Sequence, residues 1–154
     1  MHESIASRRT KVLCIDDDPD VLECLQAFLE SFGYAVRITT SGVRAIEIAA
    51  QWKADAVIVD YNMPGMNGHQ VASEIKRVRS RVAIILLSGA VDIPEETLAL
   101  VDAFIDKNLV ASHLLPTISA LVDRMPVPPQ MSDTVEPDDY SYDEIWPIEN
   151  SNEC

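Results

Sequence analysis

Short apolar runs alternate with amphipathic segments along the first 124 residues of the chain. Five of these runs have the length of strands, and they cover residues 11–16, 34–39, 55–60, 82–87 and 103–106. Apolar residues recur at helical spacing in the segments that follow the runs, near 19–32, 42–52, 69–79, 94–101 and 112–124. Strands that alternate with helices form parallel sheets covered on both faces. The chain is therefore predicted to be α/β, with a doubly wound five-stranded parallel sheet and five helices.

Individual residues refine this outline. Asp18 suits the N-cap of the first helix. The second helix is expected to bury Ala50 among its core residues, and the third helix is expected to bury Val78. Pro116 fits only the first turn of a helix, so the last helix is predicted to begin late or to bend. The run 82–87 is the most hydrophobic of the five and is predicted to be the central strand.

The composition changes after Arg124. Residues 125–154 contain eight Asp and Glu, five Pro and no Lys or Arg. We therefore divide the chain into an N-terminal extension (1–10), one domain (11–124) and an acidic, Pro-containing tail (125–154) that is predicted to be disordered. An alternative is that the tail docks on a partner, because it also carries the apolar anchors Tyr140, Tyr142, Ile145, Trp146 and Ile148.

Charge and hydropathy exclude several classes of function. The net charge of −13 disfavours binding to nucleic acid or to an anionic membrane, since both need clustered Lys and Arg. No apolar stretch approaches the roughly 18–20 residues that cross a bilayer, and no signal-peptide pattern is present. The three cysteines suit neither a zinc site nor a disulfide framework. We expect a cytoplasmic protein.

Candidate chemical groups follow the predicted strands. Asp16 and Asp17 follow the first strand, Asp60 ends the third, Ser88 follows the fourth and Lys107 follows the fifth. The carboxyl ends of parallel strands lie at one edge of the sheet, where ligands bind in open α/β folds. Carboxylates gathered there repel one another unless a cation shares their charge, and hard oxygen ligands suit Mg²⁺. An Asp carboxylate in such a place can attack phosphorus and form an acyl phosphate.

Structural explanations compete with each of these assignments. Asp16 and Asp17 could serve helix capping, Asp60 could cap the loop that follows it, and Ser88 could be a turn residue. Lys107 is harder to explain in this way, because a Lys at the end of an apolar strand needs an acidic partner. The three histidines lie at unrelated places, form no ligand set and are interpreted as incidental; they are His2, His69 and His113.

Four segments together resemble the receiver domain of two-component response regulators, over roughly residues 11–124. These segments are VLCIDDDP (12–19), VIVDYNMPGMNG (57–68), LLSGA (86–90) and FIDK (104–107). The resemblance implies a flavodoxin-like, receiver-type fold with Asp60 as the phosphoacceptor. It implies a Mg²⁺ site formed by Asp16, Asp17, Asp60 and the backbone carbonyl of Asn62. It further implies that Ser88 and Lys107 bind phosphoryl oxygens, and that Ser88 and Phe104 form the switch.

Two features depart from the family pattern. Asn108 follows Lys107, where the family usually has Pro after a cis bond. A cis bond before a non-Pro residue costs about 2.5–4 kcal/mol, so we expect a trans bond and a shifted Lys107 loop. The interval between Ser88 and Lys107 is also short, which would trim the fourth helix.

The resemblance implies a signalling switch, and because the sequence shows no second globular pattern and no basic reading helix, we expect it to act without an attached effector domain. A histidine kinase or phosphotransfer protein of a phosphorelay would phosphorylate Asp60, and a downstream protein would bind the altered surface. The protein would catalyse only its own phosphorylation and dephosphorylation, so it would not be an enzyme in the usual sense. One alternative is a receiver-like interaction module that signals without phosphate. A small aspartyl phosphatase is a further alternative, disfavoured because the chain has no cap segment over the predicted site.

Overall fold

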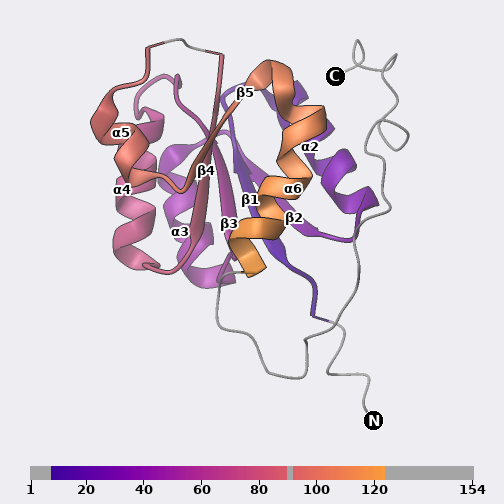
Figure 1. Ribbon diagram of the computed structural model, residues 1–154. Helices are drawn as coiled ribbons and strands as arrows, with labels where there is room; N and C mark the ends of the chain where they lie inside the picture. The colour runs from indigo at the N-terminus through magenta and orange to yellow at the C-terminus, as the bar shows by residue number, and fades with distance from the viewer. Residues whose placement is uncertain (1–7, 90–91, 124–154) are drawn as a thin grey trace.

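Five parallel strands form one sheet in the order β2-β1-β3-β4-β5 (Figure 1). The computed structural model describes residues 8–89 and 92–123. The strands are β1 (Lys11–Ile15), β2 (Ala35–Thr39), β3 (Ala56–Asp60), β4 (Ala83–Ser88) and β5 (Ala103–Asp106). The helices are α2 (Pro19–Ser31), α3 (Gly42–Trp52), α4 (Gly68–Val78), α5 (Glu95–Leu100) and α6 (Val110–Asp123), and a 3₁₀ turn, η1 (Lys107–Leu109), precedes α6. The predicted fold class is confirmed.

Helices cover both faces of the sheet and create two separate cores. Helices α2 and α6 lie on one face, and α3, α4 and α5 lie on the other (Figure 1). Alternation along β1 shows why both faces are apolar: Val12 and Cys14 face the α2/α6 core, whereas Leu13 and Ile15 face the α3/α4 core. All residues of β3 and β4 are buried, as expected for strands covered on both sides.

Several local predictions are wrong. The central strand is β3, and the more hydrophobic β4 lies between β3 and the edge strand β5. Ala50 is exposed, because the core face of α3 is centred on Ala45, Ile48 and Ala49. Val78 is 40% exposed, because it is the last residue of α4 and extends past the covered part of the sheet.

The last helix begins earlier than predicted and contains Pro116 in its interior. A proline at this position removes the N–H that would bond to the Ser112 carbonyl. Both residues lie on the exposed side of α6, where water can bond to that carbonyl in place of the missing N–H. The apolar side of the helix, which includes Leu114 and Ile118, stays buried against the sheet. The position of Pro116 is therefore compatible with a helix that starts before it.

Two predictions lie beyond what the structure describes. The acidic tail (125–154) and most of the N-terminal extension fall outside the described residues. Within residues 8–89 and 92–123, none of the helices has the length and apolar character needed to span a bilayer.

Candidate functional site

The register of the central strands brings Asp16 next to Asp60. Ile15, the last residue of β1, pairs with Val59 of β3. Asp16 follows Ile15 and Asp60 follows Val59, so the two aspartates leave adjacent strands at the same level of the sheet. Both side chains are buried: Asp16 is 2% and Asp60 5% exposed. Two carboxylates that are far apart in sequence thus share one shielded position at the carboxyl edge.

The pairing of β4 and β5 places Ser88 and Lys107 at the same end of the sheet as Asp60. Asp60 pairs with Leu87 of β4, so Ser88 lies one residue further along. Ser88 in turn pairs with Asp106 of β5, and Lys107 comes directly after Asp106. Ser88 is fully buried. The sequence prediction that these groups lie at one edge of the sheet is therefore confirmed.

Lys107 is the cation that joins the two buried aspartates. Its Nζ lies 3.2 Å from Oδ2 of Asp16 and 3.4 Å from Oδ1 of Asp60. The residue begins the 3₁₀ turn η1, where the Asp106 side chain accepts a hydrogen bond from the Asn108 N–H at 2.8 Å. All peptide bonds of the described residues are trans, as predicted for the bond before Asn108. The Asp106 cap and the 3₁₀ turn thus direct Lys107 to the aspartates without a cis bond.

The β1–α2 turn positions the first two aspartates and explains the third. Asp16 Oδ1 accepts a hydrogen bond from the Asp18 N–H at 3.0 Å, which fixes the Asp16 side chain in the turn. Asp18 Oδ1 accepts from the Asp20 N–H at 2.9 Å, so Asp18 is the N-cap of α2 as predicted. Asp17 is exposed between them. Capping therefore accounts for Asp18 and leaves Asp17 available to a ligand.

Asp16, Asp17 and Asp60 fit a divalent cation. One carboxylate oxygen from each residue can be chosen so that the three atoms lie within 4.8 Å of one another. Three carboxylates face the single ammonium of Lys107, so the site has excess negative charge. Mg²⁺ prefers hard oxygen ligands and keeps several waters, which the exposed side of Asp17 can accommodate. The donor set therefore matches magnesium.

Burial and charge perturb the protonation of these groups. Burial raises the pKa of Asp60, and the nearby Asp16 carboxylate raises it further, although Lys107 partly opposes this shift. Burial also raises the pKa of Asp16, against the Asp18 N–H and Lys107, which lower it. Burial lowers the pKa of Lys107, but Asp16 and Asp60 outweigh it and raise that pKa overall. Lys107 is thus held as a cation between carboxylates that are costly to ionise.

The loop after β3 is folded back onto the end of that strand. The Gly68 N–H donates to the Tyr61 carbonyl at 2.8 Å, and a Cβ on Gly68 would lie 2.6 Å from the Asp60 carbonyl oxygen. Only glycine allows so close an approach. Asn67 and Gln70 form a capping box that starts α4 at Gly68. Gly68 and the capping box together hold the end of this loop against the backbone of Asp60 and Tyr61.

Two predicted residues lie apart from the cluster of aspartates. Asn62 is exposed two residues after β3, and the role predicted for its carbonyl remains a prediction. Phe104 pairs with Leu86 in the sheet, but its side chain is 39% exposed and so points outward. An outward aromatic side chain on β5 and a buried Ser88 on the neighbouring strand β4 are compatible with the predicted switch pair.

One contact near the site was not predicted. Nδ1 of His69, near the start of α4, lies 2.9 Å from Oγ1 of Thr97 on α5. Thr97 is only 1% exposed, so the contact ties α5 to the helix that follows the Asp60 loop. His69 is therefore structural rather than incidental. A polar residue on the inner face of a short helix, as Thr97 is, was the available signal in the sequence.

Comparison with known proteins identifies the same domain. A sequence model described as the response regulator receiver domain matches residues 12–119. Response regulator MprA of Mycobacterium leprae is 30% identical over 117 residues, which are 74% of this chain and 51% of MprA. Response regulator SaeR of Staphylococcus aureus is 30% identical over 119 residues, which are 75% of this chain and 52% of SaeR. The chain spans about half the length of the curated relatives it matches.

Solved structures agree with the sequence comparison. A response regulator receiver domain protein from Clostridium thermocellum is 28% identical, with a TM-score of 0.70 over 75% of this chain and 95% of that one. The response regulator TrrA of Thermotoga maritima, solved in complex with Mg²⁺-BeF, is 27% identical, with a TM-score of 0.68 over 73% of this chain and 98% of that one. Since the receiver-domain match covers well over half of the sequence, the chain belongs to the receiver domain family of two-component response regulators.

Proposed function

We propose that the protein is a phosphoacceptor switch in which Asp60 receives a phosphoryl group from a phosphohistidine. The donor is a sensor histidine kinase or a phosphotransfer protein. The observation that carries the proposal is the surroundings of Asp60: a buried carboxylate with Lys107 at 3.4 Å and two further aspartates close enough to share a cation. A purely structural aspartate would not need this combination.

The chemistry follows from these surroundings. An oxygen of the Asp60 carboxylate attacks phosphorus, the phosphorus–nitrogen bond breaks, and its electron pair returns to the imidazole of the donor. Burial raises the pKa of Asp60, so its ionised form is a better nucleophile than an exposed aspartate. The Lys107 ammonium lies beside the Asp60 oxygen, where it stabilises the charge on the transferred group. Ser88 at the end of β4 supplies a hydroxyl for a phosphoryl oxygen.

The aspartate cluster requires a counter-charge before an anion can approach. Mg²⁺ held by Asp16, Asp17 and Asp60, with the Asn62 carbonyl as a further ligand, would supply that charge. The Mg²⁺-BeF complex of the Thermotoga maritima relative supports this proposal. Phosphorylation then draws Ser88 and Lys107 toward the new group and biases the surface around Phe104 for a downstream protein. Hydrolysis of the acyl phosphate resets the switch, so the protein turns over only its own phosphate.

Mass spectrometry of the intact full chain tests the proposal. With acetyl phosphate and Mg²⁺, the wild type should gain the mass of one phosphoryl group, and Asp60→Asn should gain none. Asp20→Asn is the matched control, because Asp20 is an aspartate in the first turn of α2 and lies outside the cluster. It should be labelled like the wild type. Equal labelling of Asp60→Asn and the wild type would overturn the assignment of Asp60.

The alternative of a phosphate-independent module draws support from Asn108 and from the length of α5, which has six residues. The position of Lys107 weighs against it, since the lysine reaches both aspartates despite Asn108. Insensitivity of the protein to both Mg²⁺ and beryllofluoride would favour the alternative, and a response to both would exclude it.

A further inference from the structure

Basic residues gather at the edge of the sheet opposite Asp60. The exposed or half-buried residues Arg8, Arg9, Lys11, Lys53, Arg79 and Arg81 lie where strands begin or where α3 and α4 end, and we call this surface the basic edge. Other cations near this edge are neutralised, since Lys76 pairs with Asp102 and Arg77 with Glu74. Cations thus outnumber the carboxylates Asp55 and Asp102 at the amino ends of the strands, whereas carboxylates gather around Asp60.

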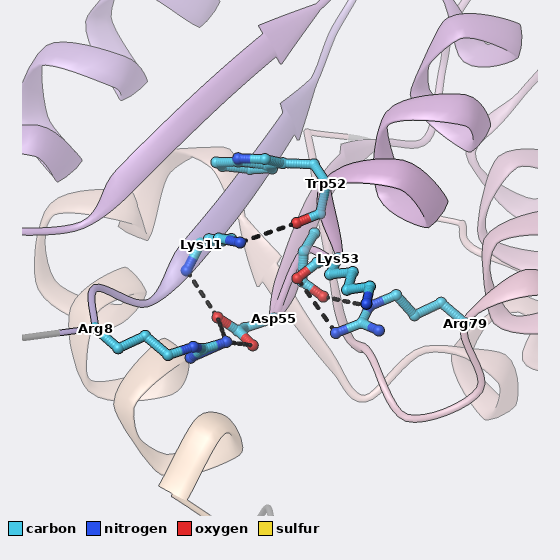
Figure 2. A network of polar contacts seen from close by, with 7 residues as sticks. Arg8, Lys11, Trp52, Lys53, Asp55 and Arg79 are labelled. Atoms are coloured by element: carbon cyan, nitrogen blue, oxygen red, sulfur yellow. Dashed lines mark hydrogen bonds and ion pairs between the residues drawn. The ribbon is translucent and has the colours of Figure 1, made fainter. Parts of the chain in front are cut away.

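Hydrogen bonds hold three cations of the basic edge, Arg8, Lys11 and Arg79, and only the Arg8 side chain bonds to a carboxylate (Figure 2). Lys11 Nζ donates to the Trp52 carbonyl at 3.2 Å, and Arg79 donates to the carbonyls of Ala54 at 2.7 Å and Lys53 at 3.2 Å. Carbonyl oxygens carry no net charge, so these cations keep theirs. Among the described contacts of the basic edge, Asp55 is the only carboxylate, and it pairs with Arg8.

Trp52 adds an aromatic platform to this surface. The ring is half-buried at the end of α3, with Lys11 Nζ 5.8 Å and the Arg37 Cζ 4.8 Å from its centroid. Both distances suit cation–π contacts. A ring flanked by two cations favours a ligand that combines negative charge with apolar or aromatic groups.

The chain itself contains a segment with that chemistry. Residues 133–149 carry seven Asp and Glu and no Lys or Arg. Tyr140, Tyr142 and Trp146 are interspersed among these acidic residues. Helix α6 (Val110–Asp123) runs from the carboxyl ends of the strands back to their amino ends, so its C-terminus lies at the edge where β1 begins (Figure 1).

The intervening residues are long enough for the segment to reach the basic edge. Nine residues, 124–132, separate α6 from the acidic segment, and an extended chain of that length spans about 30 Å. Five strands spaced by 4.7–4.9 Å make an edge about 20 Å wide. Every cation of the basic edge is therefore within reach of the tail of the same molecule.

We propose that the acidic segment 133–149 binds in cis to the basic edge, with its carboxylates on Lys53, Arg79 and Arg81 and an aromatic residue against Trp52. Tethering gives the segment a high effective concentration, so individually weak contacts suffice. The bound tail competes with any external acidic partner for this surface and leaves the Asp60 edge open. Because the contacts are largely between exposed charges, salt weakens them.

Carbodiimide cross-linking of the full chain tests the proposal, because it joins a lysine to a carboxylate only when the two are in contact. Lys53 is the exposed reporter on the basic edge. The matched control is Arg44→Lys, which places an exposed lysine on α3 near the opposite edge. Cross-links from the tail to Lys53 should exceed those to the introduced lysine by about tenfold, because docking concentrates the tail at one edge. High salt should remove the difference.

Two variants and an isotope mixture complete the test. Neutralising the tail with Asp138→Asn, Asp139→Asn, Asp143→Asn and Glu144→Gln should reduce cross-links between Lys53 and the unmutated carboxylates of the tail. Asp60→Asn should leave the cross-links unchanged, so the result does not depend on phosphorylation. In a mixture of ¹⁴N and ¹⁵N protein, cross-linked peptides should carry one isotope. Mixed-isotope peptides would show docking between molecules and would overturn the proposal, as would equal labelling of Lys53 and the introduced lysine.

Discussion

Two buried aspartates border the same strand, one at each edge of the sheet. Asp55 directly precedes β3 and is 7% exposed, and Asp60 ends β3 and is 5% exposed. Asp55 accepts two hydrogen bonds from Arg8, at 3.0 and 3.2 Å, and one from the Lys11 N–H at 2.8 Å. Asp60 shares Lys107, at 3.4 Å, with a second buried carboxylate. The two aspartates are similarly buried, but Asp55 has a cation of its own, whereas Asp60 shares one with Asp16.

This difference separates a structural aspartate from a reactive one. Asp55 has its own cation and a short backbone bond that ties β1 to β3, so its charge is used to hold the fold. Burial and the neighbouring Asp16 carboxylate raise the pKa of Asp60, and its cation, Lys107, is shared with Asp16. Perturbed groups of this kind are typical of functional sites. The comparison predicts opposite responses of the two residues to substitution.

The largest effect is expected from removing the cation that Asp60 shares. Lys107→Met should lower the rate of phosphorylation by acetyl phosphate about 10²–10³-fold, the usual cost of losing one charge-stabilising donor. Lys53→Met removes an exposed lysine at the opposite edge and should leave the rate close to that of wild type. A Lys107→Met rate near the wild-type rate would show that Lys107 has no part in the transfer.

Asp55→Ala should destabilise the fold by about 1–3 kcal/mol, because it leaves the partly buried Lys11 N–H without its acceptor. Urea unfolding at neutral pH measures the loss. The Arg8 contact should account for little of it, since the Arg8 side chain is 61% exposed, and Arg8→Ala should cost at most about 1 kcal/mol. A larger loss from Arg8→Ala than from Asp55→Ala would contradict this division.

Asp60→Asn should have the opposite effect on the free energy of unfolding and stabilise the protein when no metal is present. The folded pKa of Asp60 lies above its unfolded value, so its favourable contribution is complete below the unfolded pKa and is lost as the pH rises through the folded pKa. At neutral pH the ionised side chain therefore opposes folding, and Asn removes that cost. A gain of about 1 kcal/mol would raise the melting temperature by about 4 °C.

The pH dependence of this gain gives the smallest and most specific effect. Thermal unfolding with a chelator should show the advantage of Asp60→Asn at about pH 7, and the advantage should shrink toward about pH 4 as Asp60 protonates in the wild type. Addition of Mg²⁺ at neutral pH should stabilise the wild type more than the variant, since a ligand that binds the folded state raises its stability. An advantage that grows as the pH falls would reverse the sign assigned to Asp60.

The sequence was sufficient to predict which residues meet at the Asp60 edge. Apolar runs mark the strands, and in a parallel sheet every strand contributes its last residue to the same edge, so Asp16, Asp60, Ser88 and Lys107 were found without knowing the strand order. The order itself was not predictable in this way: hydrophobicity favoured 82–87 as the central strand, but centrality depends on which strands pair, and β3 and β4 are equally buried.

Contacts between distant side chains were also missed. The Asp55 network joins residues 47 positions apart, and neither Arg8 nor Asp55 stands out in its own segment. The His69–Thr97 contact depends on how α4 packs against α5, and helical spacing alone does not determine this. The start of the last helix was predicted too late, because the effect of Pro116 depends on which side of α6 faces water.

Chemical mapping of the modified residue tests the central claim most directly. Borohydride reduces an aspartyl phosphate to homoserine, which peptide mass spectrometry can locate after treatment of the protein with acetyl phosphate and Mg²⁺. We expect homoserine in place of Asp60, lost when Mg²⁺ is chelated. Reduction at a different aspartate, or none under conditions in which a known receiver domain is labelled, would contradict the account.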